Sequence, residues 1–298
     1  MHPAPSLIVF TTLSGLGFGL MVFLGIDPPA KGGWVMAVFA VLALGLASIG
    51  LLASLWHLGH PERAWKALSQ WRSSWLSREG VLAMAAMGSF TLYAALIVLA
   101  GAQVAVLGWL SALLALCTVA ATAMIYAQLR AIPRWHSPLT PALFVLYALS
   151  GGALLAGQVS LAGWLLLALG ALQLAAWHQG DGALADSGTT AETATGLGHL
   201  GRVRLLEAPH TGKNYLLKEM VFRIGRKHTA KLRIIAFALA IALPAIIALL
   251  TEPHHLLGGL LVLSHVAGTV VARWLFYAQA EHVVGLYYGV GSEDRQPA

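Results

Sequence analysis

Two ionisable residues, His57 and Glu79, stand where apolar stretches of the chain meet the same polar loop. Titratable groups at membrane depth are costly, so an imidazole and a carboxylate on neighbouring spans merit a functional hypothesis. Because one stretch ends where the loop begins and the next starts where it ends, the two side chains are expected at a similar depth. A histidine can hydrogen-bond a ring carbonyl and a carboxylate can take or give a proton, which suits a quinone.

A structural interpretation of the same pair stays open. The His57 side chain can extend to the membrane interface with no ligand at all. Glu79 can lie in the first turn of its helix, where the helix dipole favours an anion.

Further polar side chains are expected near the same surface and complete the candidate quinone site. Tyr126 and Arg130 lie one helical turn apart at the end of a later apolar stretch, and the other two flank the polar loop. The predicted quinone-binding residues are His57, His60, Arg78, Glu79, Tyr126 and Arg130. No catalytic residue for a terminal substrate is assigned.

The sequence argues against a metal centre in this chain. Cys117 is the only cysteine, which excludes an internal disulfide, a thiolate zinc site and an iron–sulfur cluster made by this chain alone. His57 and His178 are expected at one depth, so haem ligation by both is geometrically open. Histidines that serve packing or the interface are commoner, and we expect neither a haem b nor a metal site.

The composition sets the class of protein. Of 298 residues, 58% are hydrophobic and 10% charged, whereas soluble domains carry about 25% charged residues. This excludes a soluble globular enzyme, a disordered chain and a nucleic-acid-binding domain. The net charge of +6 is therefore expected to reflect membrane topology and not DNA binding.

Apolar stretches predict an all-α integral membrane protein that forms one membrane domain over residues 1–298. A membrane-spanning helix needs about 20 mostly apolar residues, and the uncharged intervals accommodate eight such helices. Turns are expected near 101–103 and 157–160, where the two longest intervals must fold back. The predicted spans are 6–26, 34–57, 79–100, 104–129, 139–158, 161–178, 233–251 and 255–279.

Positive charge predicts the orientation. Fifteen of the 18 Lys and Arg residues lie in the loops 59–78, 130–138 and 179–233, and positive loops stay in the cytoplasm. We expect 179–232 to be a long cytoplasmic loop and both termini to lie outside. The basic part of this loop, 202–233, is expected either to lie on anionic lipid or to dock a soluble subunit.

Two stretches of sequence resemble a known family. The run Ala53-Ser-Leu-Trp-His-Leu-Gly-His-Pro-Glu-Arg-Ala-Trp65, followed by Leu76-Ser-Arg-Glu79, is similar to the membrane anchor subunit of dimethyl sulfoxide reductase-type enzymes. The eight-span layout extends the resemblance over nearly the whole chain. The C-terminal stretch from Arg273 to Tyr288 looks like the branch that anchors cytoplasmic sulfite-oxidising molybdoenzymes.

The resemblance implies a role in a three-part complex of the bacterial inner membrane. A molybdopterin catalytic subunit and an iron–sulfur subunit dock on the cytoplasmic side, and this chain holds the site for ubiquinone or menaquinone. The family's quinone-site histidine and glutamate correspond to His57 and Glu79. Family members lack haem, and the complex serves sulfite oxidation or dimethyl sulfoxide-type reduction.

Two other classes of function stay open. A secondary transporter would show internal repeats, broken helices and charges at the membrane midplane. Here most charges lie at span ends, no repeat is evident, and only Pro244 lies well inside a span. A passive tether for soluble subunits is the third possibility, and it differs in having no cavity beside His57 and Glu79. Sequence does not decide the direction of electron flow.

Overall fold

The computed structural model describes residues 1–29, 32–56, 59–207, 211–212, 214–221 and 228–289. Within these ranges every regular element is helical and there is no strand. The long helical rods are α1 (Pro5–Ile26), α2 (Gly32–Leu55), α4 (Trp75–Ala100), α5 (Ala105–Ala127), α6 (Leu139–Leu155), α7 (Val159–Asp186), the continuous rod of α10 (Thr229–Phe237), η5 (Ala238–Ala242) and α11 (Leu243–Leu250), and α12 (His255–Ala278).

Seven of these described rods are long and apolar enough to cross a membrane. The remaining one, α6, is apolar but has 17 residues. The prediction of an all-α, multi-pass membrane protein is confirmed for the described residues. An eighth crossing stays a prediction.

Glycines end the helices where the sequence predicts turns. Gly101 has φ 64°, and its amide and that of Ala102 bond back to carbonyls in the last turn of α4. Gly157 has φ 75° after α6, and the amide of Gln158 bonds to Ala153. A residue without Cβ adopts this left-handed conformation without strain, so both chain reversals follow from local sequence.

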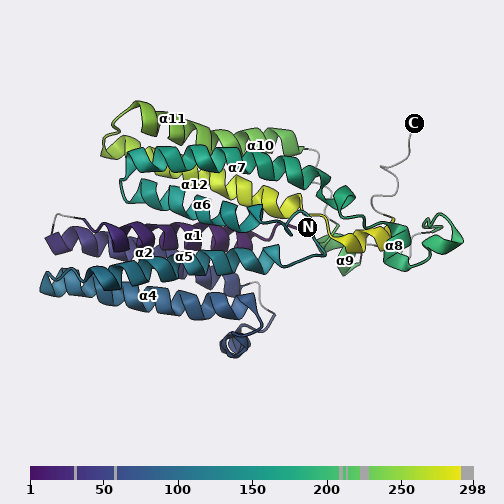
Figure 1. Cartoon of the computed structure of the whole chain (residues 1–298), viewed down its shortest axis with the longest axis horizontal. Helices are drawn as coiled ribbons and strands as arrows, with labels where there is room; N and C mark the ends of the chain where they lie inside the picture. Colours follow the sequence, from purple (N-terminus) through teal and green to yellow (C-terminus); the bar gives the residue numbers. More distant parts are fainter. Residues whose placement is uncertain (30–31, 57–58, 208–210, 213, 222–227, 290–298) are drawn as a thin grey trace.

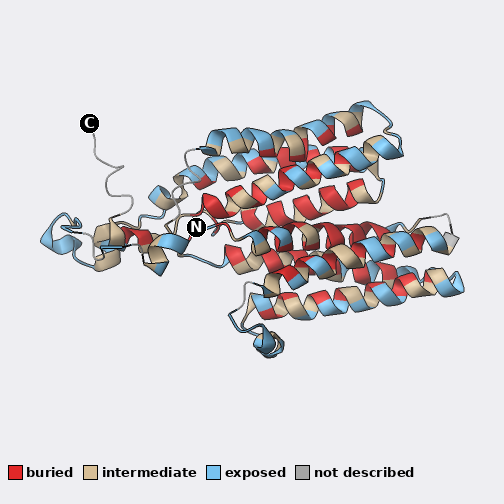
Figure 2. Cartoon of the chain, turned by 180° about the vertical axis from the view of Figure 1, so that it is seen from behind, coloured by how far each residue is buried: buried red, intermediate tan, exposed pale blue. Residues whose placement is uncertain are grey.

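The helices lie side by side along the long axis of the molecule, with α1 in the middle (Figure 1). Helix α1 contacts α2, α5, α6 and α12, and 78% of its most apolar window is buried. One core cluster is built mainly from α1, α2, α4 and α5, and the other from α6, α7, the α10–α11 rod and α12. Figure 2 shows the buried residues gathered in the middle ribbons and exposed residues on the outer faces.

Close contact between α1 and α6 depends on glycine. A Cβ atom at Gly19 would overlap the carbonyl oxygen of Ala148, and one at Gly152 would overlap the backbone of Gly19. Small residues allow the helix backbones to approach this closely. The resulting van der Waals packing stabilises helix association in lipid, where the hydrophobic effect does not drive it. By contrast, a Cβ at Gly15 would meet nothing within 4 Å.

The α10–α11 rod contains a π-helical turn just before Pro244. Proline has no N–H, so carbonyls in the preceding turn lose a backbone donor. Helix α12 supplies replacements: Ser264 Oγ donates to the Leu239 carbonyl at 2.8 Å, and His265 Nδ1 lies 2.6 Å from the Ala240 carbonyl. His265 therefore has a structural role: it provides a hydrogen-bond donor to a carbonyl that Pro244 cannot pair.

Both described chain ends lie at the same end of the bundle as the basic loops. The Met1 amine donates to the Ala280 carbonyl at 2.7 Å, and the His2 amide donates to Glu219 in the α7–α10 segment at 2.7 Å. Figure 1 shows the N-terminus on the same side of the bundle as α8 (Ala191–Thr195) and α9 (Tyr215–Glu219). We call this side of the molecule the loop end.

The prediction that the termini and the basic loops lie on opposite sides is therefore wrong. Each basic loop follows an even number of helical rods, namely two, four or six. An even number of passes returns the chain to the side where it began.

The segment between α7 and α10 has more structure than a flexible loop. Helix α7 continues to Asp186, beyond the expected span end at 178. Helix α8 begins with a capping box between Thr190 and Thr193, and the Tyr287 hydroxyl donates to the Ala194 carbonyl at 2.6 Å. Residues from the middle and the end of the chain thus pack together at the loop end.

Near the same place, His282 starts the helical turn η6 (Val283–Tyr288) by accepting from the Val284 amide at Nδ1. Burial and the nearby N-terminal ammonium lower the pKa of His282. A neutral imidazole is the form that can accept this hydrogen bond.

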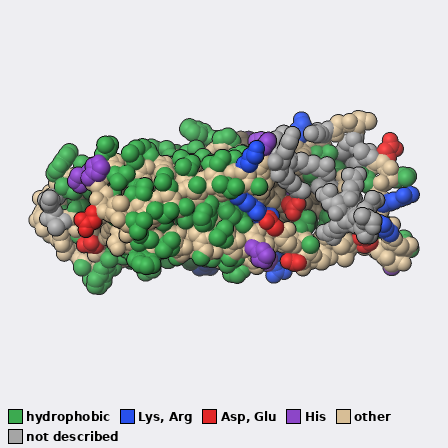
Figure 3. All heavy atoms as spheres, turned by 90° about the horizontal axis from the view of Figure 1, so that it is seen from above, with side chains coloured by type: hydrophobic (Ala, Val, Ile, Leu, Met, Phe, Trp, Pro, Cys, Tyr) green, Lys and Arg blue, Asp and Glu red, His purple; other side chains and the backbone are tan. Residues whose placement is uncertain are grey.

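The outer surface is apolar between its two ends. In Figure 3 hydrophobic side chains cover most of the visible flank, and Lys and Arg gather toward the loop end. Trp34, Trp109 and Trp164 are exposed near the opposite end and Trp56 is exposed near the loop end, as expected for tryptophan at a membrane interface. Trp135, by contrast, is 2% exposed.

Candidate functional site

Glu79 is a buried carboxyl group near the loop end. It lies in the second turn of α4 and is 4% exposed. Thr122 of α5 donates a hydrogen bond to its Oε1 at 2.5 Å. Glu79 on α4 therefore accepts its described side-chain hydrogen bond from α5, and not from the free backbone amides at the start of α4. The helix-capping interpretation of Glu79 is not supported by this geometry.

A pair of buried tyrosines lies beside this carboxyl. Tyr126 is one helical turn from Thr122 on α5, and its hydroxyl lies 2.7 Å from that of Tyr277 on α12. Both tyrosine hydroxyls lie within electrostatic range of the Glu79 carboxyl. Three helices, α4, α5 and α12, thus bring one acid and two phenols together below the loops.

Aromatic rings surround Tyr126. Its ring centroid is 5.2 Å from that of Trp135, 5.4 Å from Phe276 and 5.7 Å from Phe144. Trp135 stacks on Phe276 and its indole N–H donates to the Phe276 carbonyl at 2.9 Å. This packing explains why Trp135 is buried: its polar N–H has a partner inside the protein.

Arg273 is a buried cation that was not among the predicted site residues. It lies one turn before Tyr277 and is 4% exposed. Its guanidinium stands 3.7 Å from the Phe144 ring centroid and 5.1 Å from that of Tyr147. Its Nε has no hydrogen-bond partner, and no ion pair involving it is present among the residues that the structure describes. The principal described contacts of the guanidinium are therefore with the rings of Phe144 and Tyr147.

The sequence signal for Arg273 is its position inside the predicted span 255–279, in a helix that continues to Ala278. An arginine inside a membrane helix is costly and marks a site by default. Arg273 is also the first charged residue after a long uncharged stretch. In the hydropathy pattern it therefore looks like an ordinary charge at the end of a span. Its burial between helices is what distinguishes it, and that is a tertiary property.

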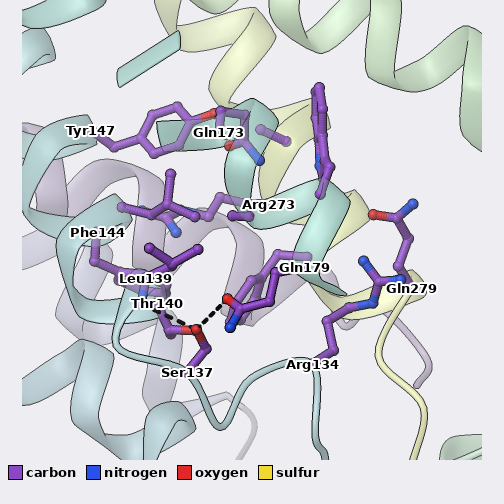
Figure 4. A pocket seen from close by; sticks show the side chains of 15 residues that line it. Arg134, Ser137, Leu139, Thr140, Phe144, Tyr147, Gln173, Gln179, Arg273 and Gln279 are labelled. Atoms are coloured by element: carbon purple, nitrogen blue, oxygen red, sulfur yellow. Dashed lines mark hydrogen bonds between the residues drawn. The ribbon is translucent and has the colours of Figure 1, made fainter. Parts of the chain in front are cut away.

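A cavity of about 50 Å³ opens beside Arg273 between α6, α7 and α12 (Figure 4). Its walls carry two hydrogen-bonded pairs. The Tyr147 hydroxyl donates to Gln173 Oε1 at 2.8 Å, and Ser137 Oγ donates to Gln179 Oε1 at 2.8 Å. Gln179 is exposed, so the polar lining extends from the buried guanidinium to the loop end.

The other predicted site residues have different surroundings. His60 is exposed and its Nδ1 lies 3.0 Å from Glu62. Arg78 donates to the carbonyls of Trp71 and Arg72, at 3.0 and 2.7 Å, and so holds the loop before α4.

Arg130 is exposed and lines a different cavity, of about 270 Å³, with His136. His57 lies outside the described residues. Of the six predicted residues, Glu79 and Tyr126 are the two that the described structure brings together.

No group of three or more His, Cys, Asp and Glu side chains suited to a metal ion occurs among the described residues. His178 is exposed.

The fold and the site define a class: a multi-pass helical membrane protein with a buried acid among tyrosines near one end of the helix bundle. Comparison with known proteins gives the family. Residues 1–279 match the model of the DMSO reductase anchor subunit (DmsC), and the chain belongs to this family. It is also similar to a sulfite dehydrogenase subunit of Allochromatium vinosum, with 31% identity over 97% of this chain and 99% of the relative. The resemblance seen in the sequence is confirmed, and the chain is a membrane anchor subunit of an oxidoreductase complex.

Proposed function

We propose that the chain exchanges electrons between a membrane quinone and the iron–sulfur subunit of a molybdopterin oxidoreductase complex, at a site that includes His57 and Glu79. The observation that carries the proposal is the buried carboxyl of Glu79, held by Thr122 beside the Tyr126–Tyr277 pair. A chain that only tethered soluble subunits would have no need of an acid at this position, since burying it is costly.

The side chains near Glu79 have the chemistry that a quinone head group requires, although Glu79 and Tyr126 border none of the cavities beside Arg273 and Arg130. Such a group supplies two-electron, two-proton chemistry and is flat, apolar on its faces and polar at two edges. The rings packed around Tyr126 make the surroundings apolar, and Glu79 can hold or release a proton. Thr122 fixes the direction of the carboxyl. His57, which follows α2 by two positions, is proposed on sequence grounds as the hydrogen-bond partner of a ring carbonyl.

Charge and exposure support a docking role for the loop end. The segment 179–233 carries nine Lys and Arg residues, and positive segments favour the cytoplasm. Leu206 is 90% exposed, Leu200 76% and Tyr215 69%. We therefore propose eight crossings, a loop end that faces the cytoplasm of a bacterial cell, and docking of the iron–sulfur subunit there. The name of the relative favours sulfite oxidation as the terminal reaction.

The test compares two activities of the purified complex. Quinone-coupled turnover is measured beside turnover with an artificial soluble electron carrier, for Glu79→Gln and His57→Ala. Glu62→Gln is the matched control, because Glu62 is an exposed carboxylate in the same region. Gln at position 79 keeps the shape and the acceptor for Thr122 but cannot titrate.

Loss of proton transfer predicts a fall of about 10²-fold or more in quinone turnover for Glu79→Gln. His57→Ala removes one polar hydrogen bond, which corresponds to about ten- to a hundred-fold in quinone affinity. Turnover with the soluble carrier and assembly should stay normal. Normal quinone turnover in both variants would place the site elsewhere, and an equal loss of both activities would assign the residues to structure.

A further inference from the structure

We propose that water in two small cavities that both border Arg273 connects Glu79 with the loop end and carries protons to and from this acid. The proposal rests on the proposed quinone site, because it concerns how the acid of that site exchanges protons. Arg273 acts as a positioning residue that orders the water.

The first cavity lies between the Glu79–Thr122 pair and Arg273. It has a volume of about 10 Å³, and Thr11, Ser14, Thr122 and Arg273 provide its polar lining. A buried water needs roughly 10–15 Å³ and two to four polar partners. The space therefore suits one water within reach of the hydroxyl that bonds Glu79.

The hydroxyls of α1 in this cavity are oriented to accept from such a water. Thr11 Oγ1 donates to the Leu7 carbonyl at 2.8 Å, and Ser14 Oγ donates to the Phe10 carbonyl at 2.6 Å. Since each hydroxyl has one hydrogen and two lone pairs, its acceptor sites stay available.

The second cavity also borders Arg273. Its volume of about 50 Å³ has room for about four waters. Gln173 and the Ser137–Gln179 pair line it toward the loop end, as Figure 4 shows. The Nε atoms of Arg134 and Arg273 are buried without a partner. Buried donors of this kind cost free energy unless water satisfies them.

Arg273 is the one described charged side chain that borders both cavities. Its guanidinium presents five N–H donors and no acceptor, so it does not relay a proton itself. It fixes the oxygen atoms of neighbouring waters in the two cavities. Protons pass between waters that are hydrogen-bonded to the same guanidinium, and then through the Thr122 hydroxyl, which accepts from a water as it donates to Glu79.

Three substitutions test the route in the intact complex. Thr122→Val removes the hydroxyl with little change of shape, Arg273→Met removes the guanidinium, and Arg273→Lys keeps a charge. Thr118→Val is the matched control: Thr118 is buried one turn away on α5, bonds the Leu114 carbonyl, and lines neither cavity.

The main readout does not depend on turnover. Infrared spectroscopy follows the Glu79 carboxyl C=O band, assigned by its loss in Glu79→Gln, at a pH where the band is present. After transfer to D₂O, its hydrogen–deuterium exchange should slow about tenfold in Thr122→Val and Arg273→Met, as for the loss of one hydrogen-bonded link. Exchange should be normal in Thr118→Val and partly restored in Arg273→Lys. A cryo-electron microscopy map of the wild-type complex should show water in both cavities.

Exchange at the wild-type rate in Thr122→Val would overturn the route, even if Arg273→Met fails to assemble. Cavities without water in the map would overturn it as well. Failure of the quinone site is distinguishable: there, Glu79→Gln leaves quinone turnover normal whatever the exchange rates are.

Discussion

Tyr126 and Tyr277 share a hydrogen bond of 2.7 Å between their hydroxyl oxygens, although 151 positions separate them in the chain. The bond joins α5 to α12, and so links the two halves of the bundle beside Glu79. It shows that the candidate site is assembled from both halves. The site therefore depends on how the halves pack against the central helix α1.

Removing one hydroxyl of this pair should destabilise the protein. Tyr126→Phe or Tyr277→Phe leaves a buried hydroxyl with its main partner gone, which costs about 1–3 kcal/mol of unfolding free energy. The double variant should cost less than the sum of the two single variants, because neither polar atom is left behind. Thermal unfolding in detergent measures the stability of the wild type, the two single variants and the double variant. Strict additivity would show that the two hydroxyls do not interact.

Much of the fold follows from sequence because the membrane simplifies the physics. Backbone groups in lipid must bond within their own helix, so an apolar interval long enough to span becomes a helix. The turns at Gly101 and Gly157 are local and were also predictable. The termini were placed on the wrong side because each basic loop follows an even number of helices and so lies on the same side as the N-terminus. The hydropathy pattern itself was not at fault.

The candidate site was predictable only in part. Glu79 is visible as a carboxylate that opens an apolar stretch, but its partner Thr122 resembles any other threonine of a membrane helix. Tyr277 and Arg273 come to the site through contacts between α12 and the first half of the bundle, which no short-range pattern encodes. Trp135 lies between two apolar stretches, where tryptophan is often interfacial, whereas tertiary packing buries it.

Topology offers a second prediction. If the loop end faces the cytoplasm, reporter fusions at residues 70 and 215 and a tag at the N-terminus should all report a cytoplasmic location. A fusion at residue 103, at the turn between α4 and α5, should report the opposite side. The reason is that residues 70 and 215 are separated from the N-terminus by an even number of membrane passes, whereas residue 103 is separated from it by an odd number. A tag at the N-terminus on the same side as residue 103 would contradict the observed helix order.

A third prediction concerns the proline-broken rod. His265→Ala removes the donor to the Ala240 carbonyl, and a buried carbonyl without a partner costs about 1–3 kcal/mol. Pro244→Ala returns a backbone N–H to this region of the rod. The cost of His265→Ala should therefore be smaller in the Pro244→Ala background, by about 0.5 kcal/mol or more.

Chemical or thermal unfolding of the four variants gives this coupling energy. An equal cost of His265→Ala in both backgrounds would mean that the histidine does not compensate for the proline. Quinone turnover serves as the functional control, since His265 lines neither cavity beside Arg273.

The last prediction tests the contact on which the two halves depend. Gly19→Ala places a methyl group against the Ala148 carbonyl of α6, so the α1 and α6 backbones must move apart. Overpacking of this kind costs about 1–3 kcal/mol. Gly45→Ala is the control, because a Cβ there meets nothing within 4 Å and alanine is the better helix former by about 1 kcal/mol. Thermal unfolding should therefore shift downward for Gly19→Ala and stay level or rise for Gly45→Ala. If Gly19→Ala separates α1 from α6, the Tyr126–Tyr277 bond should also weaken, and the coupling energy of the two tyrosines should fall in that background. An unchanged coupling would mean that the site is held together without the close approach of these two helices.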